Sequence, residues 1–211
     1  MARTLRFLMA LLIVAIIVGA PLIYKSVRDT QFRNFHVVTE GVLYRSGQLT
    51  LDGLKRIIHD HRIKTIVTLR DAYYPDDEPP DKKEEAYCVK EGLNYYRIPP
   101  RPWWANDGTV PAEKGVKVFR EVMRDPANYP VLVHCFAGIH RTGAYVAVYR
   151  MEFEGWSNER AIDEVKDLGY SNIEEDADVL SFLLEYRPRR LAADGAASTP
   201  TVRPVSYPGD R

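Results

Sequence analysis

Residues 131–143 read VLVHCFAGIHRTG, and the ten residues that follow, 144–153, read AYVAVYRMEF. The short β-branched run predicts a buried strand, and residues 144–153, which are apolar nearly all round, predict a central buried helix. A tight loop that contains Gly138 joins the two. Backbone N–H groups of such a loop can point at one spot, and the helix N-terminus adds partial positive charge there. The stretch therefore predicts a cradle of the size of a phosphate group.

Cys135 sits at the rim of this predicted cradle. Inward N–H dipoles, the helix N-terminus and the guanidinium of Arg141 all favour a thiolate, so we expect a pKa well below that of a free thiol. Arg141 can grip two oxygens of one phosphate with its planar fork, which a lysine cannot match. Thr142 can donate its hydroxyl to the sulfur and help it to leave. We expect His134 to orient the loop through hydrogen bonds rather than to act as a base.

This constellation resembles the Cys-x5-Arg signature of protein-tyrosine and dual-specificity phosphatases, because the full string HCxxGxxRTG is present between a strand and a helix. The resemblance implies that Cys135 is the nucleophile and that Arg141 binds the phosphate. It also places Thr142 and His134 at the hydroxyl and histidine positions of the signature. The substrate phosphate is then expected to contact Arg141 and the loop residues Phe136, Ala137, Gly138, Ile139 and His140.

A second resemblance lies upstream. The segment LYRSGQL, then a helix, then IKTIVTLRD is similar to the opening of compact phosphatases of the atypical dual-specificity group found in plants, fungi and bacteria. The similarity extends from about Val38 to Tyr186. Strands alternate with helices here, so we expect an α/β fold of the phosphotyrosine-phosphatase kind, a mostly parallel sheet flanked by helices, with ligands at the carboxyl ends of the strands. The predicted elements are a hairpin at 37–44, strands at 64–69, 94–98 and 131–133, and helices at 51–61, 82–91, 111–123, 158–168 and 174–186.

The mechanism that the resemblance implies needs a proton donor for the leaving oxygen, and the same carboxylate then activates water. In this family the donor is an Asp on a mobile loop before the helix that leads to the catalytic strand, which here is residues 99–108. Asp107 is the only carboxylate of that loop, and Gly108 beside it allows the loop to move. Asn-Asp-Gly is also ordinary turn chemistry. Asp71, just after a predicted strand, is the second candidate.

The composition is that of one ordinary globular domain with two additional ends. Lys and Arg total 29, as do Asp and Glu, so the net charge is zero and nothing favours nucleic acid as a partner. Cys88 and Cys135 are the only cysteines, no zinc-like spacing is present, and we predict neither a metal nor an organic cofactor. Cys88 either forms a reversible disulfide with Cys135 or is a small buried hydrophobe in a helix.

Residues 7–24, FLMALLIVAIIVGAPLIY, are free of charge and have basic residues on both sides. Their length is close to the lower limit for a membrane span, so we predict that residues 1–24 form a hydrophobic helix that serves as a single-pass anchor. The alternative is a signal peptide cleaved after Ala20, which gives a secreted or periplasmic protein. Charges on both flanks leave the side of the membrane open. Residues 25–35 are predicted as a linker, 36–190 as the phosphatase domain and 191–211 as a disordered tail.

The sequence thus predicts a hydrolase of phosphate monoesters that forms a phosphocysteine, with protein phosphotyrosine or dual-specificity substrates first. The loop interior has no lysine, which disfavours inositol lipids. The atypical group nevertheless includes enzymes that act on inositol pyrophosphates, and Arg97 and Arg101 can supply charge from outside the loop. Trp103 and Trp104 either wall the substrate cleft or pack the loop down. Two competing functions fit the same loop, namely a catalytically silent phosphate-binding adaptor at a membrane and a sulfur transferase.

Overall fold

The computed structural model describes residues 9, 12–21, 30–74 and 76–189. At its centre lies a five-stranded sheet in the order β1-β2-β5-β3-β4. The edge strand β1 is antiparallel to β2, and the other neighbouring pairs are parallel. The strands are His36–Thr39 (β1), Leu43–Ser46 (β2), Thr65–Thr68 (β3), Asn94–Arg97 (β4) and Val131–His134 (β5). The predicted mostly parallel sheet with one N-terminal hairpin is therefore present.

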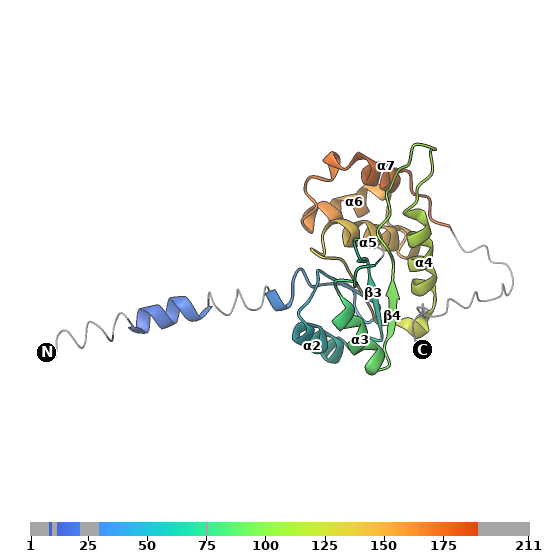
Figure 1. Ribbon diagram of the computed structural model, residues 1–211. Coiled ribbons are helices and arrows are strands. Elements are labelled where there is room, and N and C mark those ends of the chain that lie inside the picture. The colour runs from blue at the N-terminus through green and yellow to red at the C-terminus, as the bar shows by residue number, and fades with distance from the viewer. Residues whose placement is uncertain (1–8, 10–11, 22–29, 75, 190–211) are drawn as a thin grey trace.

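Helices cover both faces of the sheet (Figure 1). Leu51–His61 (α2) and Lys82–Lys90 (α3) lie on one face, and four further α-helices lie on the other. These four are Glu113–Arg124 (α4), His140–Phe153 (α5), Asn158–Asp167 (α6) and Ala177–Glu185 (α7). The layers are separated by two apolar clusters, of which the larger lies under α4 to α7 and the smaller under α2 and α3.

The strand β5 lies in the middle of the sheet, and its four residues are buried. Val131 and Val133 face the larger cluster, whereas Leu132 faces the smaller one. A parallel strand that is covered on both faces reads as a continuous apolar run, which is why residues 131–133 carried so clear a signal. The helix α5 is buried along ten of its residues, as its uniformly apolar sequence predicts.

One predicted helix is divided in the structure. Residues 174–186 were expected to be a single helix, but a short 3-10 turn at Ile173–Glu175 precedes α7. Asp176 between them has a non-helical backbone, and its carboxylate accepts a hydrogen bond from the Tyr170 hydroxyl at 2.5 Å. This hydrogen bond between side chains accompanies the break, and hydrophobic periodicity does not report it.

The N-terminal side of the domain begins earlier than residue 36. Phe32 and Phe35, which were predicted to lie in the linker, pack against the smaller apolar cluster. Residues 30–35 are thus part of the folded domain, whereas residues 25–29 of the predicted linker and the predicted tail, 191–211, lie outside the described residues.

Residues 12–21 of the predicted anchor form a helix whose apolar side chains are mostly exposed, as Leu12 (61%) and Ile17 (65%) illustrate. The rest of that segment, apart from Met9, lies outside the described residues. Within the described part of the chain, none of the helices has both the length and the apolar character that crossing a membrane requires.

Candidate active site

The loop after β5 is held by hydrogen bonds to three consecutive backbone carbonyls. The donors come from segments far away in the chain: Gln48 N to Phe136 O (2.9 Å), Asn34 Nδ2 to Ala137 O (2.8 Å) and Arg45 Nη2 to Gly138 O (2.7 Å). In a planar trans peptide the C=O and the following N–H point in opposite directions. Because these carbonyls point outward, the N–H groups of residues 137–139 are turned toward the inside of the loop. The predicted anion cradle is formed in this way.

Gly138 is required at its position by both backbone conformation and packing. Its φ angle is +77°, and a Cβ atom there would lie 2.3 Å from the backbone nitrogen of Gly47. Only glycine adopts this conformation without cost and leaves room for the neighbouring chain. The close approach of residues 46–47 to residue 138 joins the end of β2 to the loop.

The sulfur of Cys135 lies inside this loop and is 3% exposed. Its Sγ accepts a hydrogen bond from the Gly138 N–H at 3.2 Å. Burial alone raises the pKa of the Cys135 thiol, but the Thr142 hydroxyl and N–H, the Gly138 N–H and the charge of Arg141 outweigh it and hold the pKa below its ordinary value. The Thr142 hydroxyl is fully buried and has no other partner among the described residues, so its proton is free to turn toward the sulfur.

Arg141 lies in the first turn of α5 and is half-buried. Its Nη1 donates to the backbone carbonyl of Leu69, directly after β3, at 2.6 Å. The Leu69 N–H in turn donates to His134 O at 2.7 Å. The parallel neighbours β3 and β5 therefore fix the guanidinium beside the loop, and one edge of its fork remains for a ligand.

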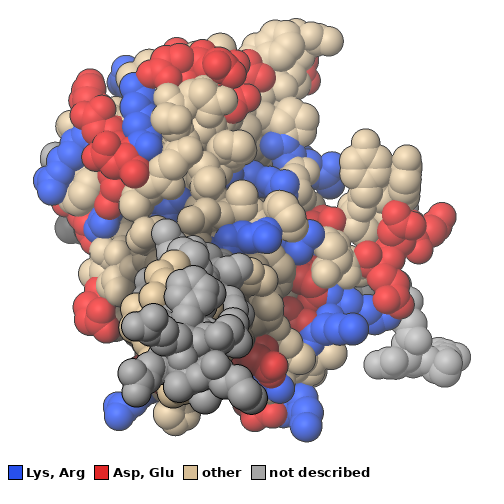
Figure 2. Space-filling model, turned by 90° about the vertical axis from the view of Figure 1, so that its left-hand side faces the viewer, with Lys and Arg blue, Asp and Glu red and all other residues tan. Residues whose placement is uncertain are grey.

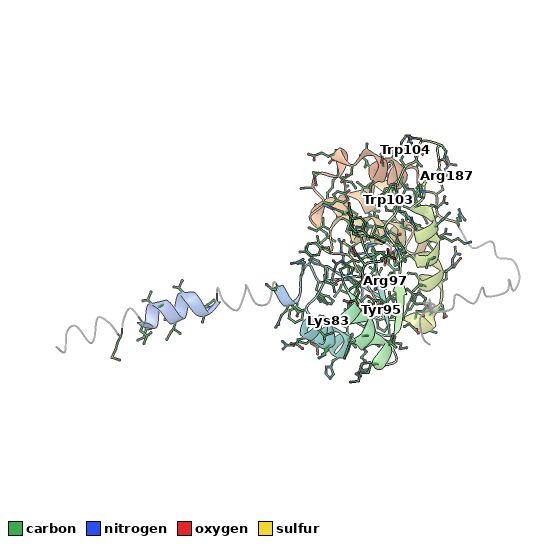
Figure 3. The ribbon with its side chains drawn as sticks, viewed as in Figure 1. Lys83, Tyr95, Arg97, Trp103, Trp104 and Arg187 are labelled. Carbon is green, nitrogen blue, oxygen red and sulfur yellow. The ribbon has the colours of Figure 1, made fainter. Side chains whose placement is uncertain are left out.

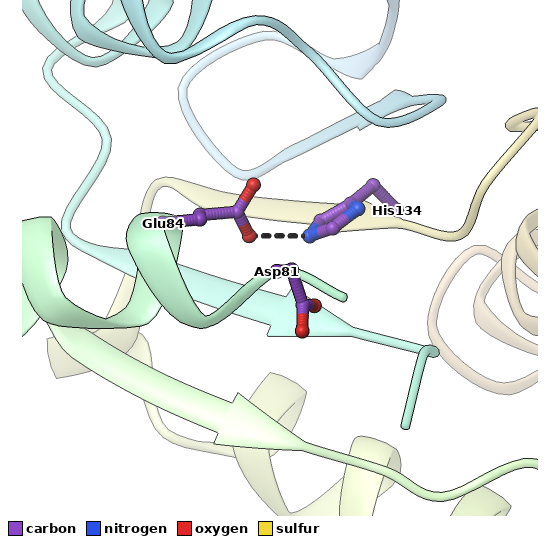
Figure 4. A group of neighbouring side chains, drawn as sticks. All are labelled: Asp81, Glu84 and His134. Atoms are coloured by element: carbon purple, nitrogen blue, oxygen red, sulfur yellow. Dashed lines mark hydrogen bonds and ion pairs between the residues drawn. The ribbon is translucent and has the colours of Figure 1, made fainter. Parts of the chain in front are cut away.

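His134 points away from the cradle and into a buried network (Figure 4). Its Nε2 lies 2.7 Å from Glu84 Oε1, and its Nδ1 lies 3.3 Å from Cys135 O. Burial alone lowers the pKa of His134, but the charges of Glu84 and Asp81 outweigh it and raise the pKa above its ordinary value. This placement agrees with an orienting role. Glu84 was not found from the sequence, because nothing in a helical KKEEAY stretch marks one glutamate as buried.

Asp81, Glu84 and His134 bring ligand-type atoms within 4.8 Å of one another. Each group is nevertheless already paired. Asp81 accepts from Thr68 at 2.5 Å and forms an ion pair with Arg97 at 2.5 Å, while Glu84 pairs with His134. The positive charge that such a cluster needs is therefore supplied by protein side chains.

The same network shows that one sequence expectation was wrong. Arg97 was expected to offer charge to the substrate from outside the loop, but its side chain is only 6% exposed and is paired with Asp81 and Glu85. It lies beside Tyr95 at the base of the network (Figure 3). Arg101 is exposed and lines a cavity of about 20 Å³ together with Arg141, so it remains available.

Asp107, the predicted proton donor, is fully exposed. Its carboxylate accepts hydrogen bonds from the Thr109 hydroxyl at 2.7 Å and from the Thr109 N–H at 3.0 Å. These two bonds hold the pKa of Asp107 below its ordinary range. Gly108 has a φ angle of +77°. The role of Asp107 stays a prediction, and so does that of Asp71, whose half-buried carboxylate accepts the N–H of Ala72 at 2.9 Å.

The two tryptophans of the predicted acid loop differ in environment (Figure 3). Trp103 packs onto α7, with its ring centroid 4.9 Å from Phe182 and 6.1 Å from Tyr145. Trp104 is 53% exposed. Trp103 therefore fastens the loop to the domain, whereas Trp104 is free to contact other molecules.

The rim of the cradle carries an exposed aromatic ring between two cations. Phe136 is 54% exposed, and the guanidinium carbons of Arg33 and Arg70 lie 4.7 Å and 5.3 Å from its ring centroid. Arg70 is held by Gln48 Oε1 at 2.7 Å. The ring of His140, at the start of α5, lies tilted against that of Tyr170, with 4.4 Å between the ring centroids. Sequence reasoning missed Arg33 and Arg70, because they approach the loop only through the fold.

Cys88 is remote from this chemistry. It is completely buried in the smaller apolar cluster, and both cysteines are free thiols. Burial raises the pKa of Cys88 to about 12, with help from the charges of Glu84 and Glu85. It has the properties of a small buried hydrophobe rather than of a reactive thiol.

A low-pKa sulfur in a ring of inward N–H groups, with an arginine beside it, defines the class of cysteine-dependent phosphatases. A family model described as DSP-PTPase phosphatase fused to NAD+ kinase matches residues 23–179, and the chain belongs to this family. It is a cysteine-based phosphatase of the DSP type, a hydrolase.

Three curated proteins illustrate the relationship. The dual specificity protein phosphatase TpbA of Pseudomonas aeruginosa is 23% identical over 141 residues, which are 67% of this chain and 57% of that protein. The tyrosine-protein phosphatase-like protein OCA2 of Saccharomyces cerevisiae is 29% identical over 57% of each chain. The inositol diphosphatase SIW14 of the same yeast is 26% identical over 64% of this chain and 44% of its own. This chain thus spans about half the length of these relatives.

Solved structures show the same fold. The core catalytic domain of SIW14, in complex with citrate, superposes with a TM-score of 0.57 at 23% identity, over 73% of this chain and 85% of that one. TpbA superposes with a TM-score of 0.54 at 22% identity, over the same shares of the two chains. The α/β fold with a mixed, mostly parallel five-stranded sheet is therefore of the phosphotyrosine-phosphatase kind.

The two cysteines should differ sharply in alkylation. We expect iodoacetamide to modify Cys135 with a rate that rises with pH to a midpoint below about 8.5, the pKa of a free thiol. Cys88 should stay unmodified from pH 5 to 8, and inorganic phosphate should protect Cys135. Peptide mass spectrometry of the folded protein over a pH series measures both rates. Equal rates for the two thiols would contradict the electrostatic description of the loop.

Proposed function

We propose that the protein hydrolyses phosphate monoesters through a phosphocysteine intermediate on Cys135. The observation that carries this proposal is the contact of the Cys135 sulfur with the Gly138 N–H, inside a loop whose carbonyls are all held outward. Such a loop stabilises first the thiolate and then the negative oxygens of a bound phosphate. A phosphate-binding adaptor needs no ionised sulfur, so the low pKa supports an active enzyme.

In the first step the phosphate occupies the cradle, with two of its oxygens on the free edge of Arg141. The Cys135 thiolate attacks phosphorus, so that the S–P bond forms as the P–O bond to the leaving group breaks. Asp107 in its protonated form donates its proton to the leaving oxygen. The Thr109 contacts favour the ionised form of Asp107, so release of Thr109 would favour the protonated form that this donation requires.

In the second step water attacks the phosphorus of the phosphocysteine and passes a proton to the Asp107 carboxylate. The S–P bond breaks, the electron pair returns to sulfur, and inorganic phosphate leaves. The buried Thr142 hydroxyl donates to the departing thiolate and lowers the barrier to its release. His134, held by Glu84, keeps the Cys135 carbonyl and therefore the start of the loop in place.

Protein phosphotyrosine, with dual specificity, is the first substrate that we propose. A relative, TpbA, is a dual specificity protein phosphatase. The exposed Phe136 ring at the rim supports an aromatic substrate, because it offers a flat apolar contact next to the cradle.

Inositol pyrophosphates are the second candidate, and the charge of the rim favours them. Arg33 and Arg70 flank Phe136, and Arg101 lies near Arg141. The chain has no net charge, and Figure 2 shows several Lys and Arg side chains near the middle of one face, with Asp and Glu side chains beside them and toward the edges. A relative, SIW14, is an inositol diphosphatase.

The nucleophile and the acid are tested with three variants and two aryl phosphates. Cys135→Ser should abolish hydrolysis of p-nitrophenyl phosphate. Asp107→Asn should lower kcat/KM, which reports formation of the phosphocysteine, about 100-fold with phenyl phosphate but much less with p-nitrophenyl phosphate, whose leaving group needs no proton. Asp71→Asn is the matched control and should keep wild-type kcat/KM with both. Activity in the Cys135→Ser variant would overturn the proposal. If phenyl phosphate hydrolysis is lost in Asp71→Asn instead of Asp107→Asn, Asp71 is the proton donor.

The substrate class is tested by removing charge from the rim. Arg33→Ala and Arg70→Ala should each lower kcat/KM for an inositol pyrophosphate roughly fivefold, the effect of about 1 kcal/mol per exposed ion pair. Both should leave p-nitrophenyl phosphate hydrolysis within twofold of wild type. Lys90→Ala, an exposed cation at the far end of α3, is the control. The pyrophosphate candidate fails if wild type prefers a phosphotyrosine peptide and if neither arginine substitution changes kcat/KM for the inositol pyrophosphate.

We also propose that the N-terminal segment places the enzyme on a membrane. The uncharged run 7–24 and the exposed apolar side chains of residues 12–18 support this placement. The full chain should float with phosphatidylcholine vesicles in a density gradient, whereas a chain beginning at Lys25 should stay at the bottom and keep its activity. Failure of the full chain to float would contradict an anchor. A mature protein that begins at Pro21 in cells would instead establish a cleaved signal peptide.

A further inference from the structure

Arg45 is a buried arginine directly behind the cradle. It lies on β2, is 1% exposed, and is among the largest fully buried side chains of the described chain. Its Nη2 donates to the Gly138 carbonyl at 2.7 Å. The same nitrogen lies 3.8 Å from the position that a Cβ on Gly143 would take, so the guanidinium sits between the loop and the first turn of α5.

The placement of Arg45 is costly for stability. Within the described part of the chain no carboxylate forms an ion pair with it, and its Nε and Nη1 atoms have no hydrogen-bond partner. Burial lowers the pKa of Arg45, and the charges of Glu164 and of the Cys135 thiolate oppose this effect. A buried cation without a paired anion is disfavoured by several kcal/mol in general, so its presence requires another reason than stability.

The hydrogen bond of Arg45 determines the direction of one peptide of the cradle. Because the Gly138 carbonyl is drawn outward to the guanidinium, the N–H of Ile139 in the same peptide points inward. Gln48 and Asn34 do the same for the two preceding peptides, but they are neutral donors. Arg45 is a charged donor and is almost completely buried, whereas Arg33, which also donates to the Phe136 carbonyl at 3.5 Å, is only half-buried.

We propose that Arg45 is a positioning residue of the active site, which holds the Gly138–Ile139 peptide in its anion-binding direction and adds a buried positive charge directly behind the loop that encloses the Cys135 sulfur. The proposal rests on the proposed function. It makes β2, and not only α5, a source of the charge that stabilises the thiolate and the bound phosphate.

Several other groups bear on the same sulfur and are kept constant in the test. Arg141 and Thr142 of α5 face Cys135 directly, and His134 precedes it on β5 with Glu84 and Asp81 behind. The groups that face Arg45 are His36 of β1, Arg150 of α5 and Glu164 of α6. Arg150 is itself paired with Glu164 and Glu154, so Glu164 is not free to neutralise Arg45.

The test compares Arg45→Met and Arg45→Lys with wild type in the full chain. Arg45→Met removes the donor and the charge, and we expect the alkylation midpoint of Cys135 to rise by about one pH unit, a tenfold loss of thiolate. Protection of Cys135 from alkylation should require about tenfold more inorganic phosphate than in wild type. At pH 6, kcat/KM for p-nitrophenyl phosphate should fall by a larger factor than the alkylation rate of Cys135. Arg45→Lys keeps the charge but not the planar guanidinium, so its alkylation midpoint and its kcat/KM should lie between those of wild type and Arg45→Met.

Arg120→Met is the matched control. Arg120 of α4 is also buried (4% exposed), but it forms an ion pair with Glu152 of α5. This variant should lose stability, as a merely structural arginine predicts, and keep the wild-type alkylation midpoint and phosphate protection. Circular dichroism establishes that each variant is folded.

A folded Arg45→Met protein with wild-type midpoint and phosphate protection would overturn the proposal. If Arg45→Met does not fold, Arg45→Lys decides: an unchanged midpoint and unchanged kcat/KM contradict the proposal, and a rise with weaker phosphate protection supports it. Alkylation needs no turnover, so these outcomes are distinct from failure of the proposed function, which would appear as a wild-type protein inactive on phosphate esters.

Discussion

The outward direction of three carbonyls is the constraint on which the site depends. The carbonyls of Phe136, Ala137 and Gly138 each accept a hydrogen bond from a donor in another part of the chain. If one of these peptides rotated, a carbonyl oxygen would replace an N–H beside the sulfur, and the thiolate would lose a favourable dipole and gain an unfavourable one. The chemistry of Cys135 thus depends on residues 34, 45 and 48, none of which touches a substrate in the proposed mechanism.

The parallel sheet explains how such distant residues meet. The strands β2, β5 and β3 end at the same edge, so the segments after Ser46, His134 and Thr68 emerge side by side. From them come the Gln48 donor, the nucleophile and the Leu69 carbonyl that holds Arg141. The site lies at the carboxyl ends of the strands, as in other open α/β sheets. Behind it, the Asp81–Arg97 and Glu84–His134 pairs join the start of α3 to the strands β4 and β5.

The family relationship covers the fold and the class of reaction, and the rim of the cradle differs in kind from its interior. The interior is made of backbone N–H groups, which suit an anion of the size of a phosphate. The rim is made of the exposed Phe136 ring, the guanidinium groups of Arg33 and Arg70 beside it, and Arg101 near Arg141. In the proposed mechanism the interior binds the phosphate, and the rim lies where we propose that the rest of the substrate binds.

Local sequence determined the elements that depend on neighbours along the chain. The β-branched run of β5, the glycine in the loop, the apolar α5 and the order Cys135, Arg141, Thr142 are all readable from residues 131–153, since hydrophobic period and turn chemistry act over a few residues. The tertiary structure alone decided which charges are available. Arg97 forms an ion pair with Asp81, and Glu84 forms one with His134. Arg45 is buried behind the loop, and Cys88 is buried in the smaller cluster. A guanidinium or carboxylate has the same letter in a sequence whether it is paired, buried or free, and only its neighbours in space decide its chemistry.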